Sequence, residues 1–221
     1  MKKLVVTATA VVASLAVIGS AAASLPASQA LRYGGPGVHS WTRTGDSPQD
    51  ANTRALRLKV GEGQWVSAKS NRSMNIATEA EQVRNLSFEF KESTHVGAGA
   101  PRISVQFQNG DVAYLSASYC NHPLAVSGGT WGQADFTRFV NNCTIWVTGE
   151  TAGPSGSYSA DGTRSAWQVY TDANPGQIVE QAYLVADEPG TYRIDRLSLG
   201  ASVMYTAGDR VGKVCTTEAS C

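Results

Sequence analysis

Carboxylates are the first residues to consider for chemistry, because a glycosidase needs two of them flanking the bond that it cleaves. Glu89 and Glu92 are three residues apart, and no Glu-x-Asp-x-x-Glu run places acids along one strand. The other candidates are scattered, mostly in expected loops: Glu150, Asp161, Asp172, Glu180, Asp187 and Glu188. Solvated surface charge is the simpler interpretation, and a secreted polysaccharide hydrolase is the alternative.

Nucleophilic and metal chemistry have even less support. Residues 153–157 read Gly-Pro-Ser-Gly-Ser, which departs from Gly-x-Ser-x-Gly at its last position. Of the three histidines, His39, His95 and His122, only His122 falls in a plausible site loop. No His-Glu-x-x-His, Gly-Lys-Ser/Thr or Gly-x-Gly-x-x-Gly motif occurs, so we expect no zinc, no nucleotide and no catalytic residue.

The tryptophans of the chain are better suited to ligand binding than to catalysis, since sugars are held by aromatic faces with polar groups around them. Trp146 and Trp167 lie in apolar segments that we expect to be core strands, and Trp41 is expected to plug the core near the first strand. Trp65 and Trp131 each follow a glycine-containing run, so we expect these two to be exposed platforms.

Four cysteines are present, at 120, 143, 215 and 221. An even number in an exported chain favours disulfides, and four cysteines allow three pairings. We prefer Cys120–Cys143 and Cys215–Cys221, because each pair closes a local loop. Metal binding or thiol catalysis would need CxxC spacing or a clear histidine partner, and neither occurs.

The loop between Cys120 and Cys143 is the first candidate for a binding site, because a disulfide would preorganise its polar and aromatic groups. The leading contacts are Trp131, Asp135 and Arg138, followed by Trp65, Tyr119 and His122. The alternative is that Trp131, with Phe136 and Phe139, only packs this loop onto the fold.

The N-terminus predicts export. Lys2 and Lys3 precede an apolar stretch over residues 4–18, and small residues at 21–23 favour cleavage after Ala23. Residues 28–30 offer a second cleavage site. An uncleaved membrane anchor is the alternative, but the apolar stretch is shorter than the roughly 20 residues of a span.

Charge excludes some partners. The chain has 18 basic and 18 acidic residues, and loss of Lys2 and Lys3 leaves 16 against 18, a formal charge of −2. No basic block occurs, so binding to nucleic acid or to an anionic membrane is unsupported. We expect a secreted monomer, extracellular, with a possible glycan or cell-surface ligand.

From Trp41 onward the apolar residues alternate with a period of two, which predicts strands. The pattern covers residues 56–60, 86–90 and 103–107, with later strands expected at 144–148, 166–171, 178–185 and 192–199. Asn109-Gly110 predicts a two-residue hairpin turn that pairs Phe107 with Val112 and Val105 with Tyr114. A change of phase predicts a bulge near Asp195-Arg196.

Many short strands separated by turn residues predict one all-β domain, an antiparallel β-sandwich of jelly-roll type. The expected organisation is a signal peptide over 1–23, a flexible leader over 24–40, the sandwich over 41–200 and a tail over 201–221. The tail would hold the second disulfide and a short strand at 202–206. The one helix expected, a weak one, covers 75–83.

Three short segments carry a resemblance. Residues 40–42 (Ser-Trp-Thr), 55–60 (Ala-Leu-Arg-Leu-Lys-Val) and 192–199 (Tyr-Arg-Ile-Asp-Arg-Leu-Ser-Leu) resemble the first and last strands of galactose-binding-like jelly rolls. Several carbohydrate-binding modules share that fold. The middle of the chain is similar to secreted, uncharacterised actinobacterial domains. The resemblance implies the fold and, more weakly, sugar binding, since one fold serves many functions.

Jelly rolls of this type often hold a structural calcium ion through carboxylate and carbonyl oxygens. The resemblance places Asp195 at such a ligand position, with Asp46 and Asp50 as the early candidates for a partner. The sequence therefore predicts a secreted, non-catalytic sandwich that binds carbohydrate or another surface ligand. A purely structural or protein-interaction domain remains a third possibility.

Overall fold

The structure is a computed structural model of the whole chain. It describes residues 31–43, 54–70, 78–91, 100–120, 124–125, 131–138, 142–149, 156–200 and 204–205. The predicted signal peptide, His122 and the pair Cys215–Cys221 lie outside these residues. Where the structure describes the chain, no helix is long and apolar enough to cross a membrane.

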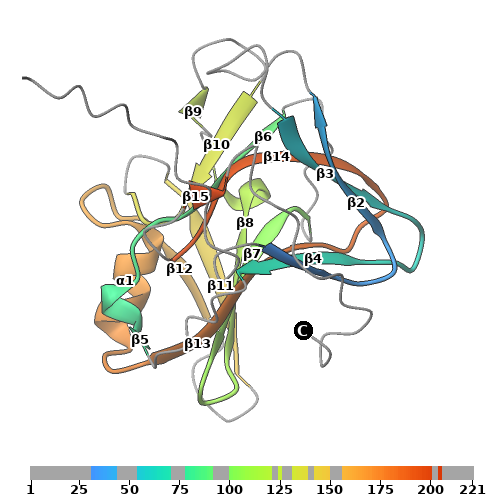
Figure 1. Ribbon diagram of the computed structural model, residues 1–221. Helices are drawn as coiled ribbons and strands as arrows, with labels where there is room; N and C mark the ends of the chain where they lie inside the picture. Colours follow the sequence, from blue (N-terminus) through green and yellow to red (C-terminus); the bar gives the residue numbers. More distant parts are fainter. Residues whose placement is uncertain are drawn as a thin grey trace, which may run out of the picture.

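Two antiparallel sheets form the fold. Figure 1 shows the helix at one side of the strands. The first sheet has the order β1 (Leu31–Gly34), β4 (Val66–Ser70), β13 (Ile178–Ala186), β7 (Arg102–Phe107), β8 (Val112–Ser116), β11 (Thr144–Thr148) and β12 (Gly156–Ser159), with β5 (Thr78–Glu79) paired to β13.

The second sheet has the order β2 (Val38–Arg43), β3 (Arg54–Val60), β14 (Gly190–Leu199), β6 (Leu86–Lys91), β10 (Trp131–Asp135) and β9 (Leu124–Ala125), with β15 (Met204–Tyr205) paired to β14. The predicted all-β antiparallel sandwich is thus confirmed. Strand β15 also matches the short strand expected in the tail.

Period-two alternation creates the core between the sheets. Leu56, Leu58 and Val60 on β3 are buried, as are Ile103 and Val105 on β7. In both sheets, alternate residues of a strand point into the core and the others point to the outer face. A binding site on the surface of a sheet is therefore made of these outward-pointing residues.

The β7–β8 hairpin is confirmed, but its predicted register is wrong by one residue. Val105 pairs with Ala113, not with Tyr114. The Gly110 amide donates to the Phe107 carbonyl, the Phe107 amide donates to the Asp111 carbonyl, and Gly110 has a φ of 89°. The loop is therefore a three-residue turn with its left-handed residue at Gly110. The shift turns Val112 and Tyr114 to the outer face.

The predicted bulge in β14 is confirmed. Asp195 pairs with Glu89 and Ser198 with Ser87, so the register shifts between them. Arg196 takes up the extra residue with a φ of 47°. The bulge keeps Leu199 opposite Leu86 in the core phase.

Two secondary-structure predictions are wrong. Residues 166–171, expected as a strand, belong to helix α1 (Ala166–Ala173), because Trp167, Tyr170 and Thr171 recur at helical spacing and are buried together. Ser165 and Gln168 form a capping box at its start. Within 75–83, expected as a helix, the described part holds only β5 and a single turn, η2 (Ala80–Gln82).

The flexible leader predicted over 24–40 is also wrong from residue 31 onward. Strand β1 pairs with β4, and β2 pairs with β3. Leu31 and Tyr33 are buried in the core, so burial of apolar side chains fixes a segment whose glycines and serines suggested a loose chain.

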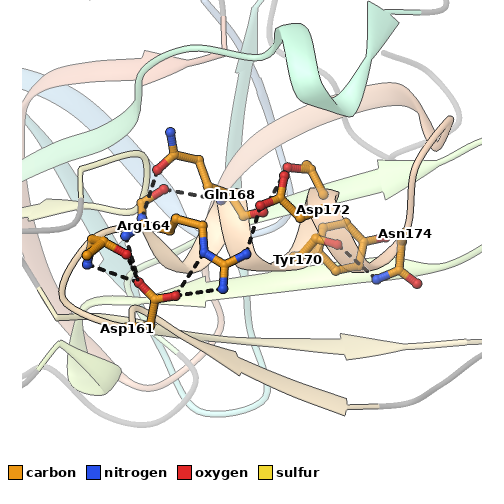
Figure 2. A network of polar contacts seen from close by, with 9 residues as sticks. Asp161, Arg164, Gln168, Tyr170, Asp172 and Asn174 are labelled. Carbon is orange, nitrogen blue, oxygen red and sulfur yellow. Dashed lines mark hydrogen bonds and ion pairs between the residues drawn. The ribbon is translucent and has the colours of Figure 1, made fainter.

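Helix α1 is tied down by a polar network on its exposed side, shown in Figure 2. The Arg164 guanidinium joins Asp161 at 2.7 Å to Asp172 at 2.9 Å. Backbone hydrogen bonds from Arg164 and Thr163 hold the pKa of the Asp161 carboxyl well below its usual range. The Asn174 amide donates to the Tyr170 carbonyl and to the Tyr158 hydroxyl.

A tyrosine closes the corner between β13 and β14. Tyr192 is fully buried, and its hydroxyl donates to the Glu188 carbonyl at 2.9 Å. Burial, followed by the charges of Glu188 and Asp187, raises the pKa of Tyr192 to about 12. The hydroxyl therefore stays a donor at neutral pH and holds a corner where the chain passes from one sheet to the other.

Tyr192→Phe tests this corner. The substitution removes the hydrogen bond that the hydroxyl donates to the part-buried Glu188 carbonyl, so we expect the free energy of unfolding to fall by about 1 kcal/mol. Urea unfolding at pH 7 measures the change. Tyr114→Phe, which removes a hydroxyl from a half-exposed ring, is the control and should change stability by less than about 0.5 kcal/mol. Equal effects would contradict a special role for the corner.

The predicted Cys120–Cys143 disulfide is confirmed. The two residues face each other in an isolated bridge, with Cα atoms 4.0 Å apart and 23 residues of sequence separation. The bond joins the end of η3 (Ala117–Tyr119) to the residue before β11. It thereby fixes the approach to two neighbouring strands of the first sheet.

Replacing both cysteines by alanine should lower the free energy of unfolding by about 3 kcal/mol, because the unfolded chain is no longer closed into a loop. Denaturant unfolding of the oxidised proteins measures this loss. The gap between wild type and variant should close in reductant. A gap that persists in reductant would assign the loss to packing of the side chains instead.

Candidate functional site

The outer face of the first sheet carries an exposed tryptophan. Ile145 and Val147 on β11 point into the core, so Trp146 between them points outward and is 47% exposed. Among the described residues, Trp146 and Val38 are the large apolar side chains with high exposure. A tryptophan left in water on a rigid strand is a candidate contact for a ligand.

Further aromatic residues lie across the same face. Trp146 pairs with Tyr114, Tyr114 with Ser104, and Ser104 with Tyr183. Directly opposed residues of neighbouring strands point to the same side of a sheet, so these side chains share the outer face. We call Trp146, Tyr114 and Tyr183, with Tyr119 beside Trp146, the aromatic row.

Tyr119 joins the aromatic row from η3. Its ring centre lies 6.2 Å from that of Trp146, with the planes tilted by 57°. Tyr119 precedes Cys120, and Trp146 lies three residues after Cys143. The disulfide between these cysteines therefore holds both ring-bearing segments in place.

A cation lies against the centre of the aromatic row. The Arg102 guanidinium carbon is 5.3 Å from the centre of the Tyr114 ring, within the range of a cation–π contact. Arg102 also forms an ion pair of 2.7 Å with Asp187 and donates to the Ser104 hydroxyl at 3.3 Å. Asp187 follows the end of β13, at the corner that Tyr192 closes. The Arg102–Asp187 ion pair therefore links this corner to the aromatic row.

Amides flank the aromatic row two residues further along the strands. Gln106 on β7 pairs with Gln181 on β13 and with Val112 on β8. Both glutamines are half-buried and alternate with core residues, so they lie on the outer face. Each amide offers a donor and an acceptor beside the aromatic rings.

The predicted trio in the disulfide loop is only partly brought together. Trp131 is 1% exposed and begins β10, so the prediction that it forms an exposed platform is wrong. Asp135 is buried, and its carboxylate accepts from the amide and hydroxyl of Thr137 and pairs with Arg138 at 3.3 Å. Arg138 alone reaches solvent, with 67% of its side chain exposed.

Trp65 is half-buried and does not stand as a free platform. Its ring and carbonyl lie against Gly35, where any Cβ would collide with them, and Gly37 donates to the Trp65 carbonyl. Gly35 has a φ of 94°, so this turn needs glycine for both reasons. Trp65 thus packs the β1–β2 connection.

The remaining tryptophans are buried or exposed as predicted only in part. Trp167 is buried, as expected, although on a helix. Trp41 packs at the edge of the core, and its indole donates to the Tyr33 hydroxyl at 3.0 Å. Trp146, expected in the core, is the exposed one. Its apolar neighbours suggested burial, whereas the alternation that they establish points Trp146 outward.

Two carboxylates meet on the outer face of the second sheet. Glu89 and Asp195 are directly opposed on β6 and β14, and they are 2% and 4% exposed. Arg196 pairs with Glu89 at 3.3 Å. Burial raises the pKa of Glu89, Arg196 lowers it less, and Asp195 raises it further. Glu89 and Asp195 are thus a buried carboxylate pair with Arg196 as a counterion.

No group of three or more histidine, cysteine or acidic side chains able to hold a metal occurs among the described residues. The carboxylate of Asp195 accepts from the Arg196 amide at 2.8 Å, and Asp46 and Asp50 lie outside the described ranges. Calcium binding at Asp195 therefore stays a prediction.

In comparisons with known proteins, no family model, no curated protein and no solved structure matches the chain.

Glu89→Gln tests the buried carboxylate. A carboxyl whose pKa is raised on folding binds a proton more readily in the folded state, so stability falls as pH rises above 4.5, the ordinary pKa of a glutamate. We expect the glutamine variant to unfold at higher denaturant concentration than wild type at pH 7, with the advantage shrinking toward pH 4. Urea titrations at both pH values measure this. A variant that is less stable at pH 7 would show that the Arg196 ion pair outweighs the cost of burial.

Proposed function

We propose that this chain is a secreted, non-catalytic protein that binds carbohydrate through the aromatic row on the outer face of its first sheet. The observation that carries the proposal is Trp146, 47% exposed on a strand whose neighbouring residues are core. Hiding such a ring from water on binding supplies favourable free energy without rearranging the fold.

The chemistry around Trp146 suits a sugar. Sugar rings present patches of C–H groups that stack on aromatic faces, and the hydroxyl groups around them need donors and acceptors. Gln106 and Gln181 supply amides beside the rings, and Arg102 and Asp187 supply charged groups. The combination of rigid aromatic surface and a polar border is typical of ligand sites.

The aromatic row also has a direction. Tyr114 and Tyr183 are separated by β7, so their strands are two spacings, or about 10 Å, apart. That distance is comparable to the length of a disaccharide. A linear polysaccharide would therefore lie across the strands, with Trp146, Tyr114 and Tyr183 contacting it at different points along its length.

Export supports an extracellular ligand. The N-terminal sequence predicts a signal peptide, and the Cys120–Cys143 disulfide suits an oxidising compartment. The resemblance of three segments to galactose-binding-like jelly rolls agrees with this proposal. Absence of a basic block argues against nucleic acid as the partner.

A glycan array of plant, fungal and bacterial wall polysaccharides, followed by titration with oligosaccharides of the best hit, tests the proposal. Trp146→Ala should weaken binding about tenfold or more, since an aromatic contact of about 1–3 kcal/mol is lost. Tyr114→Ala should weaken it less. Val38→Ala, which trims an exposed apolar residue on the other sheet, is the matched control and should bind normally.

Binding that survives Trp146→Ala unchanged would place the glycan elsewhere on the protein. An array without any hit would remove carbohydrate as the ligand and leave an interaction with a protein surface as the alternative. Near-ultraviolet circular dichroism of each variant establishes that the fold is retained.

A further inference from the structure

A concave site that shares no residue with the aromatic row lies beside helix α1. It is a pocket of about 450 Å³ between η2, the end of β10 and the first turns of α1. The residues that matter here are Glu81, Arg84, Asn85, Arg138, Trp167 and Gln168. We call this cavity the α1 pocket. None of its lining residues belongs to the aromatic row.

Hydrogen-bond donors dominate the polar lining of the α1 pocket. Arg84 uses one terminal nitrogen on the Glu81 carbonyl, and Arg138 uses its Nε on Asp135. Since a guanidinium has five N–H groups, both arginines keep donors for a ligand. Both side chains are exposed, so these donors are reachable.

Two amides complete the lining. The Gln168 Oε1 accepts from the Ser165 amide in the capping box, which fixes the side chain at the pocket edge and leaves its NH₂ group as a donor. Asn85 has an exposed amide on a backbone with a φ of 62°. The lining thus holds two guanidinium groups and one carboxylate, that of Glu81, while Asp135 pairs with Arg138.

The walls of the α1 pocket are fixed by long-range hydrogen bonds. The Trp167 amide donates to the Phe136 carbonyl, and its indole donates to the Ala80 carbonyl at 3.0 Å. The Glu81 carboxylate accepts from the Gly176 amide at 2.9 Å. These bonds join η2, β10 and α1, so the cavity is preformed and a ligand does not have to order it.

We propose that the α1 pocket binds a sugar acid, a small hydroxyl-rich ligand that carries one carboxylate. The planar fork of a guanidinium matches a carboxylate with two parallel hydrogen bonds. The amides of Asn85 and Gln168 suit hydroxyl groups, because an amide can both donate and accept. The volume is within the range of small-molecule sites, and the polar lining excludes an apolar ligand.

The probe is glucuronate, titrated into the full-length mature protein by calorimetry at low ionic strength. Glucose, which lacks the carboxylate, and acetate, which lacks the ring, are the comparators. We expect glucuronate to bind at least tenfold more tightly than either, and added salt to weaken its binding. Glucose binding equally well would overturn the role of the arginines, and acetate binding equally well would overturn the role of the ring.

Arg84→Ala and Arg138→Ala should each weaken glucuronate binding about tenfold, the loss expected for one charge-assisted hydrogen-bonded contact. Asn85→Gly removes an amide while permitting the positive φ, so it weakens binding without straining the turn. Lys59→Ala removes an exposed cation on β3 and is the matched control. Unchanged affinity in both arginine variants, or no glucuronate binding at millimolar concentration, would overturn the proposal.

Trp146→Ala separates this site from the aromatic row. Glucuronate binding should be unaffected by that substitution, because the α1 pocket shares no residue with the row. Loss of glucuronate binding in Trp146→Ala would show a single site on the first sheet and would overturn the assignment of a second one.

Discussion

One corner of the chain joins central strands of the two sheets. Strands β13 and β14 are consecutive, yet β13 lies between β4 and β7 in the first sheet, and β14 lies between β3 and β6 in the second. The hydrogen bond from Tyr192 to the Glu188 carbonyl closes the turn between them. Every other strand of the described chain adds outward from these two central strands.

The same corner reaches the candidate binding surface. Asp187, at the corner, holds the Arg102 guanidinium, and that guanidinium lies over the Tyr114 ring. Tyr114 in turn is opposed to Trp146. The arrangement of the aromatic row therefore depends on contacts that also organise the fold, which is how a sheet can present rings in fixed positions without a dedicated loop.

Period two was enough to predict the strands β3, β6, β7, β11, β13 and β14, because burial of one strand face leaves a strong pattern. The predictions were wrong where hydrogen bonds of particular side chains, and not the apolar period, determine the local structure. At the β7–β8 turn, Asn109 accepts from the Asp111 amide through its side chain, which favours the longer loop. In 166–171, a short apolar run fits either period, and the capping box at Ser165 is the sequence signal that indicates a helix.

The candidate site was only partly predictable. The Cys120–Cys143 disulfide is confirmed, but the exposed tryptophan near it is Trp146 and not Trp131. Strict alternation between Ile145 and Val147 would have indicated Trp146. Pairing partners such as Tyr114 and Tyr183 depend on strand order, and a single sequence does not specify which strands become neighbours.

The disulfide has a consequence for the energetics of any ligand that reaches Trp146. It limits how far apart the segments that bear Tyr119 and Trp146 can move in the unfolded chain, so the two rings stay close together during folding. The entropy of bringing them together is therefore lost before a ligand arrives, and less of the contact energy is spent on ordering the surface. A covalent bond within the scaffold can thus act on affinity.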